Sequence, residues 1–436
     1  MSNVEILDIF LAQRLIGKLF RFDNRASTPM IRFVADKRFS ADAQQATVSL
    51  SMLAQHTAQQ ESLWNDLGSS LFNGRDGRLP AFFQNMLPEG VFRTHLAQLR
   101  GCREDDHFAL FAACGLDLPG AVKALPAALT KDQLAALLTQ DNTPLDMSVT
   151  ADPLPLGVSI SGVQPKLGLI ELGGRYVARK RQGVTRIIGK LPQIDRPRLP
   201  EVEHLSLGLA QAAGANVCDH KLVPLAQMDI EHEYTLGGSS HFLAVTRFDR
   251  DGSKRIHCED FAQVLNVDPQ QKYTGASYAA MGSLLMRFPE SLGVNAVHEL
   301  LRLLVINDLM GNYDAHLKNF CLIYPDGRTP YLSKAFDIVA WSVYLGGQGS
   351  ALALYRDTTA GTKPPIGLSP TTLRVFCERV GIAEKPCASV IKETVSKALE
   401  LWPELIESSL MYDTQKEKLL ARLASHRFAK GSRRYS

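Results

Sequence analysis

Residues 311–320 read GNYDAHLKNF and follow the most strongly apolar helix that the sequence predicts, over residues 298–310. Two short strand-like segments come next, 322–324 and 331–338, separated by the turn residues PDG. We therefore predict a polar loop followed by a hairpin. Because a hairpin reverses the chain, its second strand carries Asp337 back beside the loop.

This group of polar side chains fits the needs of phosphoryl transfer. A carboxylate must orient the attacking hydroxyl and accept its proton, while an amide oxygen and a second carboxylate hold Mg²⁺ against the phosphates. Asp314 is then the base, and Asn319 and Asp337 are the metal ligands. Lys318 is a cation that can offset developing charge, and His316 completes the polar loop. The spacing D-x-x-x-x-N, with an Asp 18 residues later, is typical of protein kinases, although Asp and Asn are also ordinary turn residues.

A loop of small residues lies upstream. Residues 157–166 read GVSISGVQPK, and backbone N–H groups in such a loop can cradle phosphates, although the Walker sequence G-x-x-x-x-G-K-[ST] does not occur in it. Lys190, at the end of the strand predicted over 186–191, can reach the phosphates of ATP, and Glu203 on the following helix can pair with it. A surface lysine and a solvated glutamate at a helix start are the alternatives at these two positions.

The order of predicted elements indicates a mixed α/β segment, then a small β-rich lobe, then a large helical lobe. We predict three domains, 1–128, 129–250 and 251–436, with residues 125–155 as a connection between lobes. A cleft between two lobes is a common place for a ligand. The predicted elements are strands over 30–34, 47–50, 167–170, 176–179, 186–191, 222–225 and 242–248, and helices over 82–87, 108–112, 201–213 and 298–310.

Composition limits the class and location of the protein. The 436 residues carry a net charge of only +3, so whole-chain charge does not argue for binding to nucleic acid or membranes. The seven cysteines form no C-x-x-C pair, which fits free thiols in a reducing cytosol better than disulfides or a zinc site. The N-terminus lacks the features of a signal peptide, and no apolar stretch approaches 18 residues. We therefore expect a cytoplasmic protein without a membrane span.

Four segments occur in the order in which one known family has them. They are FFQNMLPEG (82–90), FALFAACGLDLPGAV (108–122), SISGVQPK (159–166) and NYDAHLKNF (312–320). On these segments the chain resembles the HipA-type kinase toxins of bacterial toxin–antitoxin pairs, and the resemblance covers nearly the whole chain. The last segment, which resembles the family's D-x-H-x-K-N-F motif, is the most specific of the four.

The resemblance implies a two-lobed, protein-kinase-like α+β fold with a β-rich N-terminal lobe, an extra N-terminal subdomain and a mainly helical C-terminal lobe. It also implies transfer of the γ-phosphate of ATP to a protein serine or threonine. Asp314, Asn319 and Asp337 keep the roles given above, and Lys190 contacts the phosphates. The family's nucleotide-binding positions fall on Ser159, Ile160, Ser161, Gly162, Val163, Gln164, Lys166, Lys190, Thr246, Arg247 and Phe248.

Two of these segments carry further expectations from the resemblance. Residues 246–248 fall on the hinge that meets adenine, and Thr246 stands where the family often has Glu or Gln, so a side-chain bond to the adenine amino group is altered. Ser159 falls on the serine that these kinases phosphorylate on themselves, and Ser161 adds a second hydroxyl, so either or both could accept phosphate. Phosphorylation adds roughly −1.5 to −2 charge. We expect the modified loop to be repelled from the ATP site and the phosphorylated enzyme to be inactive.

The resemblance also brings expected targets and partners. The family's familiar targets are aminoacyl-tRNA synthetases, and its familiar partner is a small helix-turn-helix antitoxin that binds operator DNA. The chain itself shows no DNA-reading helix, so contact with DNA is expected mainly through the partner.

Three alternatives compete with this interpretation. One is a catalytically weak relative that acts as a binding and co-repressor partner of the antitoxin; the intact set of Asp314, Asn319 and Asp337 argues against it. Another is a small-molecule kinase on the same fold. Residues 82–122, which lie outside the minimal kinase, favour the toxin over it. The third is metal-dependent hydrolysis with His316 as a ligand, but no second histidine lies at helical spacing from it.

Overall fold

The structure is a computed structural model that describes residues 2–23, 28–127, 145–147, 150–154, 164–178, 184–230, 232, 234–347, 350–356 and 365–432. The predicted site residues that lie outside these ranges are Ser159, Ile160, Ser161, Gly162 and Val163. The domain boundary predicted after residue 128 also lies outside them. The boundary predicted after residue 250 falls inside the short strand β12 (Arg250–Asp251) and stays a prediction.

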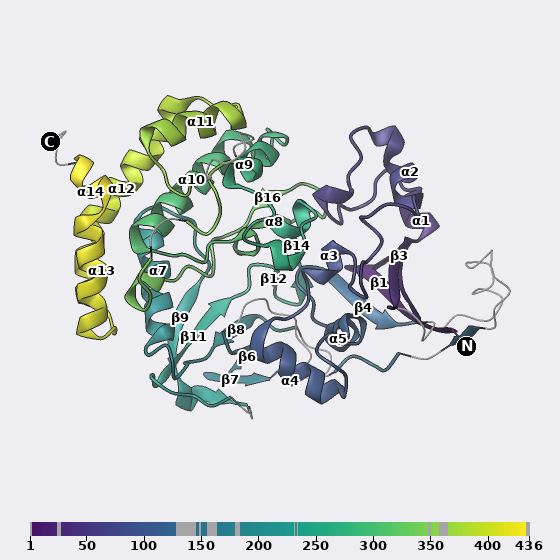
Figure 1. Cartoon of the computed structure of the whole chain (residues 1–436). Coiled ribbons are helices and arrows are strands. Elements are labelled where there is room, and N and C mark those ends of the chain that lie inside the picture. Colours follow the sequence, from purple (N-terminus) through teal and green to yellow (C-terminus); the bar gives the residue numbers. More distant parts are fainter. Residues whose placement is uncertain are drawn as a thin grey trace.

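An antiparallel sheet lies in the N-terminal part of the chain, drawn in purple and blue in Figure 1. Its strand order is β3-β2-β1-β4, and a short further strand, β5, runs parallel to β1. Short helices pack against this sheet and enclose an aromatic core that includes Phe33, Trp64 and Phe83. The elements are β1 (Ser2–Leu11), β2 (Arg14–Asp23), β3 (Met30–Ala35), α1 (Lys37–Ser40), α2 (Gln60–Asn65), α3 (Ala81–Gln84), α4 (Gly90–Arg100), α5 (His107–Cys114), β4 (Val122–Pro126) and β5 (Leu145–Met147).

The prediction of a strand over residues 47–50 is wrong. These residues have no strand neighbour and lie instead against the C-terminal lobe. Thr47 N donates to Gly327 O at 2.9 Å, and Ser49 Oγ donates to the buried Glu259 at 2.5 Å. The polar groups of this segment are therefore satisfied by distant partners, which the local alternation of residue types does not reveal.

A second sheet forms the β-rich lobe, at the lower centre of Figure 1, with strand order β10-β7-β6-β8-β11-β9. All neighbouring strands are antiparallel except β10 and β7. The five strands and the helix predicted for this region are confirmed to within two residues at most ends. The elements are β6 (Lys166–Leu172), β7 (Arg175–Ala178), β8 (Ile187–Lys190), α7 (Leu199–Ala212), β9 (His220–Pro224), β10 (Met228–Asp229), β11 (His241–Thr246) and, after β12, β13 (Lys254–Arg255).

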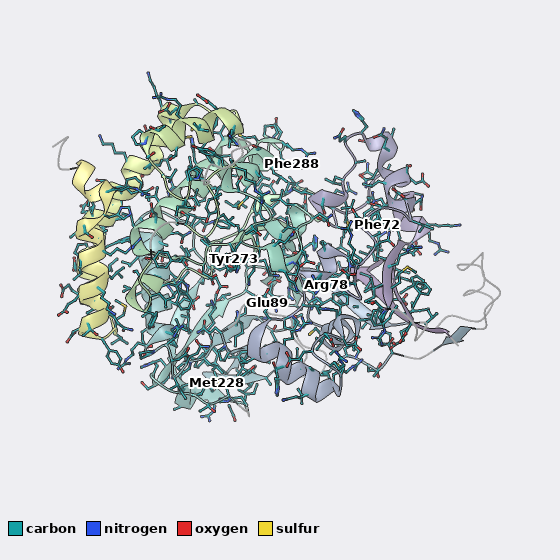
Figure 2. All side chains as sticks on the ribbon, in the orientation of Figure 1. Phe72, Arg78, Glu89, Met228, Tyr273 and Phe288 are labelled. Atoms are coloured by element: carbon teal, nitrogen blue, oxygen red, sulfur yellow. The ribbon has the colours of Figure 1, made fainter. Side chains whose placement is uncertain are left out.

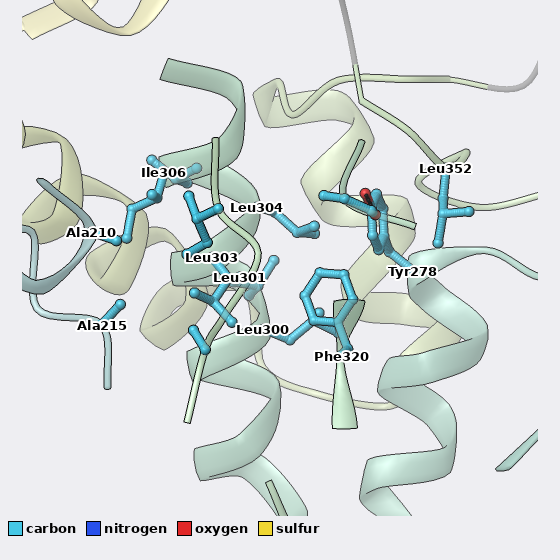
Figure 3. Close-up of a cluster of buried hydrophobic side chains, with 14 of the residues drawn as sticks. Ala210, Ala215, Tyr278, Leu300, Leu301, Leu303, Leu304, Ile306, Phe320 and Leu352 are labelled. Carbon is cyan, nitrogen blue, oxygen red and sulfur yellow. Dashed lines mark hydrogen bonds between the residues drawn. The ribbon is translucent and has the colours of Figure 1, made fainter. Parts of the chain in front are cut away.

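The helical lobe fills the upper left of Figure 1, and α10 (Gly293–Met310) is its central helix. Leucines lie on almost every side of α10, and Figure 3 shows Leu300, Leu301, Leu303 and Leu304 among the buried side chains around it. The second half of the helix, from Leu300 to Met310, is buried except at Arg302, as expected of a segment that is apolar on most sides. The remaining helices of the lobe are α8 (Phe261–Val264), α9 (Tyr278–Met286), α11 (Pro370–Val380), α12 (Glu384–Glu407), α13 (Asp413–Ser425) and α14 (Arg427–Ser432).

Helix α10 ends at Gly311, which has a φ of 73°. A Cβ atom at this position would lie 2.6 Å from Ser342 Cβ and 2.9 Å from Arg422 Cζ. Both the left-handed conformation and the close packing require glycine. The cap therefore fixes where the polar loop begins.

The predicted hairpin after the polar loop is confirmed, but its second strand covers only residues 331–332 of the predicted 331–338, so Asp337 lies beyond the strand. Strand β15 (Cys321–Tyr324) pairs with β16 (Tyr331–Leu332) on one side and with β14 (His257–Asp260) on the other. Single-turn 3₁₀ helices connect other elements: η1 (Leu50–Met52), η2 (Thr57–Gln59), η3 (Leu225–Gln227), η4 (Pro269–Gln271), η5 (Leu317–Asn319) and η6 (Trp341–Val343). Across the described ranges, no helix combines the length and the apolar character needed to cross a membrane.

Candidate active site

A lysine and two carboxylates meet where the β-rich lobe faces the helical lobe. Lys190 ends β8, Glu203 lies on α7, and Asp337 follows β16. The Lys190 ammonium donates to both carboxylates, and the side chains of Lys190 and Glu203 are only 5% and 0% exposed. The sequence left open whether Glu203 pairs with Lys190, and the structure contains the pair.

The two carboxylates of this cluster stabilise the charge of Lys190. Burial alone would lower the pKa of Lys190, but Asp337 and Glu203 outweigh burial and raise that pKa above its ordinary value. Burial would likewise raise the pKa of Asp337, but Lys190 and then Lys166 outweigh it and lower that pKa. At neutral pH, Lys190 is therefore a cation and Asp337 an anion.

The backbone of Asp337 adopts a positive φ of 56°, which residues other than glycine rarely do. Such a conformation costs on the order of 1 to 3 kcal/mol and persists only where the surroundings hold it. Here the preceding Ala335 donates to Asn216 O at 2.7 Å and accepts from Cys218 N at 2.9 Å. These bonds tie the backbone just before Asp337 to the chain that follows α7.

Side-chain amides shape the polar loop after α10. Asn312 Nδ2 donates to Asn307 Oδ1 at 3.0 Å, and Asn312 Oδ1 accepts from Asp314 N at 3.1 Å. From the other end of the loop, Asn319 Nδ2 donates to Asp314 O at 2.7 Å. This bond uses the amide nitrogen of Asn319, so its carbonyl oxygen is the atom that can face a cation.

Asp314 presents its carboxylate at the open side of the loop, and its side chain is 43% exposed. The hydroxyl of Tyr273 donates to Asp314 Oδ1. Burial raises the pKa of Asp314, and the hydrogen bond from Tyr273 partly offsets that rise. Figure 2 labels Tyr273 near the centre of the molecule, not far from Glu89 of the N-terminal subdomain. The contact shows that a hydroxyl group can reach the Asp314 carboxylate.

His316 lies buried beneath this contact. Its Nε2 atom is 3.9 Å from Asp314 Oδ1, and its ring meets the Tyr273 ring edge to face, with 5.0 Å between centroids. Burial lowers the pKa of His316 to about 4, and Lys272 contributes to the shift. The imidazole is therefore neutral at pH 7 and supports the loop without adding charge.

Lys318 reaches the N-terminal subdomain. Its ammonium donates to Asn85 O at 2.6 Å and lies 3.7 Å from Glu89 Oε1 and 3.6 Å from Asp260 Oδ2. Its charge is therefore matched by two carboxylates and a carbonyl of the protein. The role of Lys318 as a cation near the transferred phosphoryl group stays a prediction.

An apolar hollow of about 130 Å³, which we call the inner hollow, lies between the lobes. Ile188 and Val245 of the β-rich lobe, Met86 of the N-terminal subdomain and Phe336 line it, together with Cys218, Cys258 and Cys321. The predicted hinge residues Thr246, Arg247 and Phe248 line it as well. Its charged members include Lys166, Lys190 and Asp337.

A second hollow of about 400 Å³, the outer hollow, adjoins the first. Its lining includes Asp314, His316, Asn319, Tyr273 and Gln164. Lys166 and Asp337 line both hollows, so the two meet at these side chains. The hollows together gather the predicted site residues that the structure describes, with Lys318 on the inner side.

The backbone amides of the predicted hinge are already engaged. Thr246 N donates to Asp219 O at 2.8 Å, and Arg247 N donates to Arg186 O at 2.9 Å. A ligand in the inner hollow would therefore meet other groups of the hinge first. Phe248 is one of them, and its ring lies 5.4 Å from that of Phe336.

Behind the hinge, three arginines and two aspartates form a buried charge cluster. It consists of Asp117 from the N-terminal subdomain and Arg247, Asp249, Arg250 and Arg255. Asp117 Oδ1 accepts from Arg250 at 2.9 Å and from Arg255 at 3.0 Å, and Asp249 pairs with Arg247 at 2.8 Å. Burial alone would raise the pKa of Asp117, but the three arginines lower it to about 2. The cluster joins the N-terminal subdomain to the hinge.

Sequence analysis missed several residues of the site. They are Asn85, Glu89, Asp117, Asp260 and Tyr273. Three of them lie inside segments that resemble family motifs, 82–90 and 108–122, so a signal was present but their contacts were not visible. Tyr273 is an isolated tyrosine in a loop, and nothing in the sequence pointed to it.

Comparisons with known proteins extend over nearly the whole chain. Residues 7–125 match the HipA N-terminal domain, and residues 158–402 match the HipA-like C-terminal domain. A Sinorhizobium fredii protein named "Putative kinase Y4dM" is 30% identical over 415 residues, which cover 92% of each chain. The serine/threonine-protein kinase toxin HipA of Shewanella oneidensis is 26% identical over 366 residues, which cover 78% of this chain and 76% of that protein.

The fold also matches a solved structure. A chain in the complex of Shewanella oneidensis MR-1 HipA, HipB and operator DNA aligns with a TM-score of 0.67 and 22% identity. The alignment covers 96% of this chain and 97% of the other. The predicted two-lobed α+β kinase-like fold, with its extra N-terminal subdomain, is confirmed.

Proposed function

This chain belongs to the HipA family, and from that membership we propose that it is an ATP-dependent serine/threonine protein kinase. The observation that carries the proposal is the contact of Lys190 with both Glu203 and Asp337, in a hollow that adjoins Asp314 and Asn319. Protein kinases use a lysine–glutamate pair, a metal-binding aspartate, and a loop with a catalytic aspartate and an asparagine. Lys190, Glu203, Asp337, Asp314 and Asn319 are the five corresponding residues here.

The residues fit a magnesium nucleotide. The inner hollow is mainly apolar and suits a base. Lys190, which lines it, and Lys166, where it meets the outer hollow, suit phosphates. Asn319 and Asp337 offer the oxygen atoms that a hard divalent cation prefers. Mg²⁺ bound there supplies charge neutralisation for the transferred phosphate.

In the proposed reaction, Asp314 orients the acceptor hydroxyl and takes its proton as the hydroxyl oxygen attacks the γ-phosphorus. The bond from that phosphorus to the β–γ bridging oxygen breaks, and ADP leaves. Tyr273 supports this assignment, because its own hydroxyl is hydrogen-bonded to Asp314 Oδ1. Lys190 holds the phosphates, and Glu203 keeps the lysine in place. His316, which is buried and neutral, supports the polar loop after α10.

We propose that the chain acts as a toxin and modifies itself at Ser159 or Ser161, which rests on the sequence alone because both residues lie outside the described ranges. Its other substrate is proposed to be a translation protein such as an aminoacyl-tRNA synthetase. The related Shewanella chain was solved with HipB and operator DNA. On that ground we propose a small helix-turn-helix antitoxin as the partner, with DNA contact through it.

The test is the intact mass of the purified protein before and after incubation with Mg-ATP. We expect a gain of one or two phosphates that map to Ser159 or Ser161, and no gain in an Asp314→Asn variant. An Asp105→Asn variant is a matched control, because Asp105 is an exposed carboxylate that pairs with Arg103 and lines neither hollow. If a protein that carries no phosphate at the start gains none, the kinase proposal is wrong and a non-catalytic binding partner is favoured.

A further inference from the structure

A third hollow, which we call the rear hollow, is larger than the inner and outer hollows, with a volume of about 890 Å³. This volume lies within the usual range for small-molecule sites. The turn between β1 and β2 and the strand β4 contribute one part of its wall, and β6, β8 and the β12–β13 hairpin contribute the rest. The N-terminal subdomain and the β-rich lobe therefore share it.

The rear hollow is strongly basic. Lys123, Arg186, Lys254 and Arg255 line it, and Glu171 is the one carboxylate among the described residues that do so. Glu171 is already paired with Lys221 at 3.1 Å. Among the described side chains that line the hollow, four cations therefore face one carboxylate.

Two of these cations are held at a cost in electrostatic energy. Burial lowers the pKa of Lys123, and the guanidinium groups of Arg255 and Arg250 lower it further. Burial also lowers the pKa of Arg255, and Arg250 adds to that shift. The Arg255 side chain is 6% exposed, and its Nε atom has no hydrogen-bond partner among the described residues. An anion in the hollow would relieve this repulsion and could satisfy the buried N–H group.

The rear and inner hollows lie on opposite faces of one strand. Ile187 lines the rear hollow and Ile188 lines the inner hollow, as expected because successive residues of a strand point to opposite faces. Thr246, at the end of β11, lines both. A ligand in one hollow is thus separated from a ligand in the other by a single layer of the sheet.

A chain of charged contacts also joins the two hollows. Arg255 donates to Asp117 Oδ1 at 3.0 Å, and Arg247, which lines the inner hollow, lies 3.5 Å from the same oxygen. An anion that draws Arg255 toward the rear hollow would weaken its hold on Asp117. The position of Arg247 at the hinge would respond to that change.

We propose that the rear hollow is a binding site for a small polyphosphorylated anion, and that its occupant changes the affinity of the inner hollow for nucleotide. A concave site shared by two domains suits a compact ligand better than a duplex, which needs an extended basic surface. The first half of the proposal is independent of the proposed kinase activity. The second half rests on it.

The probe is sodium tripolyphosphate, titrated calorimetrically into the full chain. The titration is made in the presence of a saturating non-hydrolysable ATP analogue and fixed free Mg²⁺, so that the nucleotide site is occupied. We expect binding of one tripolyphosphate that weakens with salt, as surface-accessible ionic contacts do. A Lys123→Gln/Lys254→Gln double variant should bind at least about tenfold more weakly.

The matched control is Lys37→Gln/Lys392→Gln, which removes two exposed lysines outside the rear hollow and should bind as the unmodified protein does. The site is refuted if the two double variants bind equally, if binding vanishes when the ATP analogue is present, or if duplex DNA binds at the hollow and tripolyphosphate does not.

The coupling has its own readout. The dissociation constant of the ATP analogue should change by about threefold or more when tripolyphosphate is added, and the reciprocal change should be equal in size. An unchanged constant overturns the coupling and leaves the site intact. If the analogue itself fails to bind, the proposed function fails, and the comparison of the double variants still decides whether the site exists.

Discussion

Tyr273 donates its hydroxyl proton to Asp314 and places its ring edge to face against His316. The backbone carbonyl of the neighbouring Lys272 accepts a hydrogen bond from Leu317 N at 3.3 Å, and the Lys272 ammonium donates to Glu89 Oε2 at 2.7 Å. The loop that carries Tyr273 is thus attached both to the polar loop and to the N-terminal subdomain. The direction of the Asp314 carboxylate depends on this attachment.

A Tyr273→Phe variant should therefore lower kcat for self-phosphorylation by at least about tenfold, since a hydrogen bond to a charged group contributes roughly 1.5 to 3 kcal/mol. The KM for ATP should stay within about twofold, because the inner hollow is not changed. Initial rates at varied ATP concentration measure both. Tyr331→Phe is the control, because Tyr331 is an exposed tyrosine on β16 outside the hollows. A rise in KM with kcat unchanged would show that Tyr273 acts in ATP binding instead.

The sequence predicted individual site residues where spacing along the chain was enough. Asp314, Asn319 and Asp337 were recognisable because a short loop and a hairpin bring them together. Tyr273 was not, because it meets Asp314 across 41 positions through a loop that no periodic pattern describes. Asp117 lies 138 positions from Arg255, so the same reason applies more strongly.

At the level of elements, glycine caps set where helices end. Gly311 ends α10 with φ 73°, and Gly381 ends α11 with φ 76°. They differ in their surroundings, because a Cβ at Gly311 would meet Ser342 and Arg422, while nothing lies within 4 Å of one at Gly381. Alanine substitutions at these two glycines therefore distinguish the cost of a left-handed backbone, present at both, from the cost of steric crowding, present only at Gly311.

Gly381→Ala should cost roughly 1 kcal/mol of unfolding free energy, the usual cost of a left-handed alanine. Gly311→Ala should cost at least about 2 kcal/mol, because the new methyl group also collides with its neighbours, and it should lower kinase activity by displacing the start of the polar loop. Urea unfolding and phosphorylation assays on both variants test this. Equal losses would mean that Ser342 and Arg422 move aside freely.

Strand β14 carries a second element-level feature, the buried Glu259. It accepts from Leu50 N at 3.0 Å, from Ser49 Oγ at 2.5 Å and from the hydroxyl of Tyr324. Burial raises the pKa of Glu259 to about 7 despite these three donors. The residue thus joins the segment around Ser49 to the sheet of the helical lobe through a group that titrates near neutrality.

Because the folded-state pKa of Glu259 lies above its ordinary value of 4.5, the folded protein takes up this proton more readily than the unfolded chain. Ionisation of Glu259 therefore costs stability as pH rises from about 4.5 to 7, by an amount on the order of 3 kcal/mol. A Glu259→Gln variant should lose this dependence. The melting temperature of the variant minus that of the unmodified protein should therefore increase between pH 5 and pH 8. An exposed Glu393→Gln variant should follow the unmodified protein, and parallel curves for Glu259→Gln would contradict the assignment.

Elements were predictable where hydrophobic periodicity ran over a whole element. Helix α10 and strands β6, β8 and β11 are of this kind, since each is buried along a face that its own sequence displays. The segment over residues 47–50 has similar residue types but is held by Glu259 and Gly327 from other parts of the chain. Local pattern cannot distinguish the two situations.

At the scale of the whole molecule, the buried charge cluster holds the N-terminal subdomain against the kinase lobes. Asp117 binds Arg250 and Arg255, and nearby Gly120 N donates to Asp249 Oδ2 at 2.8 Å. Within the β-rich lobe, the sequence predicted five strands and α7 to within two residues at most ends. It could not predict how the parts dock, because these contacts join residues more than 120 positions apart.

An Asp117→Asn variant should lose roughly 3 to 5 kcal/mol of stability, the usual effect of removing one partner from a buried ionic group. Since the cluster reaches the hinge through Arg247, the loss should be accompanied by weaker binding of ATP in the folded protein at low temperature. Denaturant unfolding and nucleotide titration measure the two effects. Asp105→Asn, which removes an exposed carboxylate, should leave both unchanged. An Asp117→Asn protein of normal stability would show that the arginines find other partners.

The inner hollow draws on residues from Asn85 to Asp337, and the cap at its catalytic edge packs against Arg422. A growing chain on the ribosome therefore holds no complete site until nearly all of it has been synthesised. The N-terminal subdomain emerges first, and the last lining residues of the inner hollow, Phe336 and Asp337, are synthesised more than 200 residues later. The inner hollow can therefore receive a ligand only in a chain whose synthesis is almost finished.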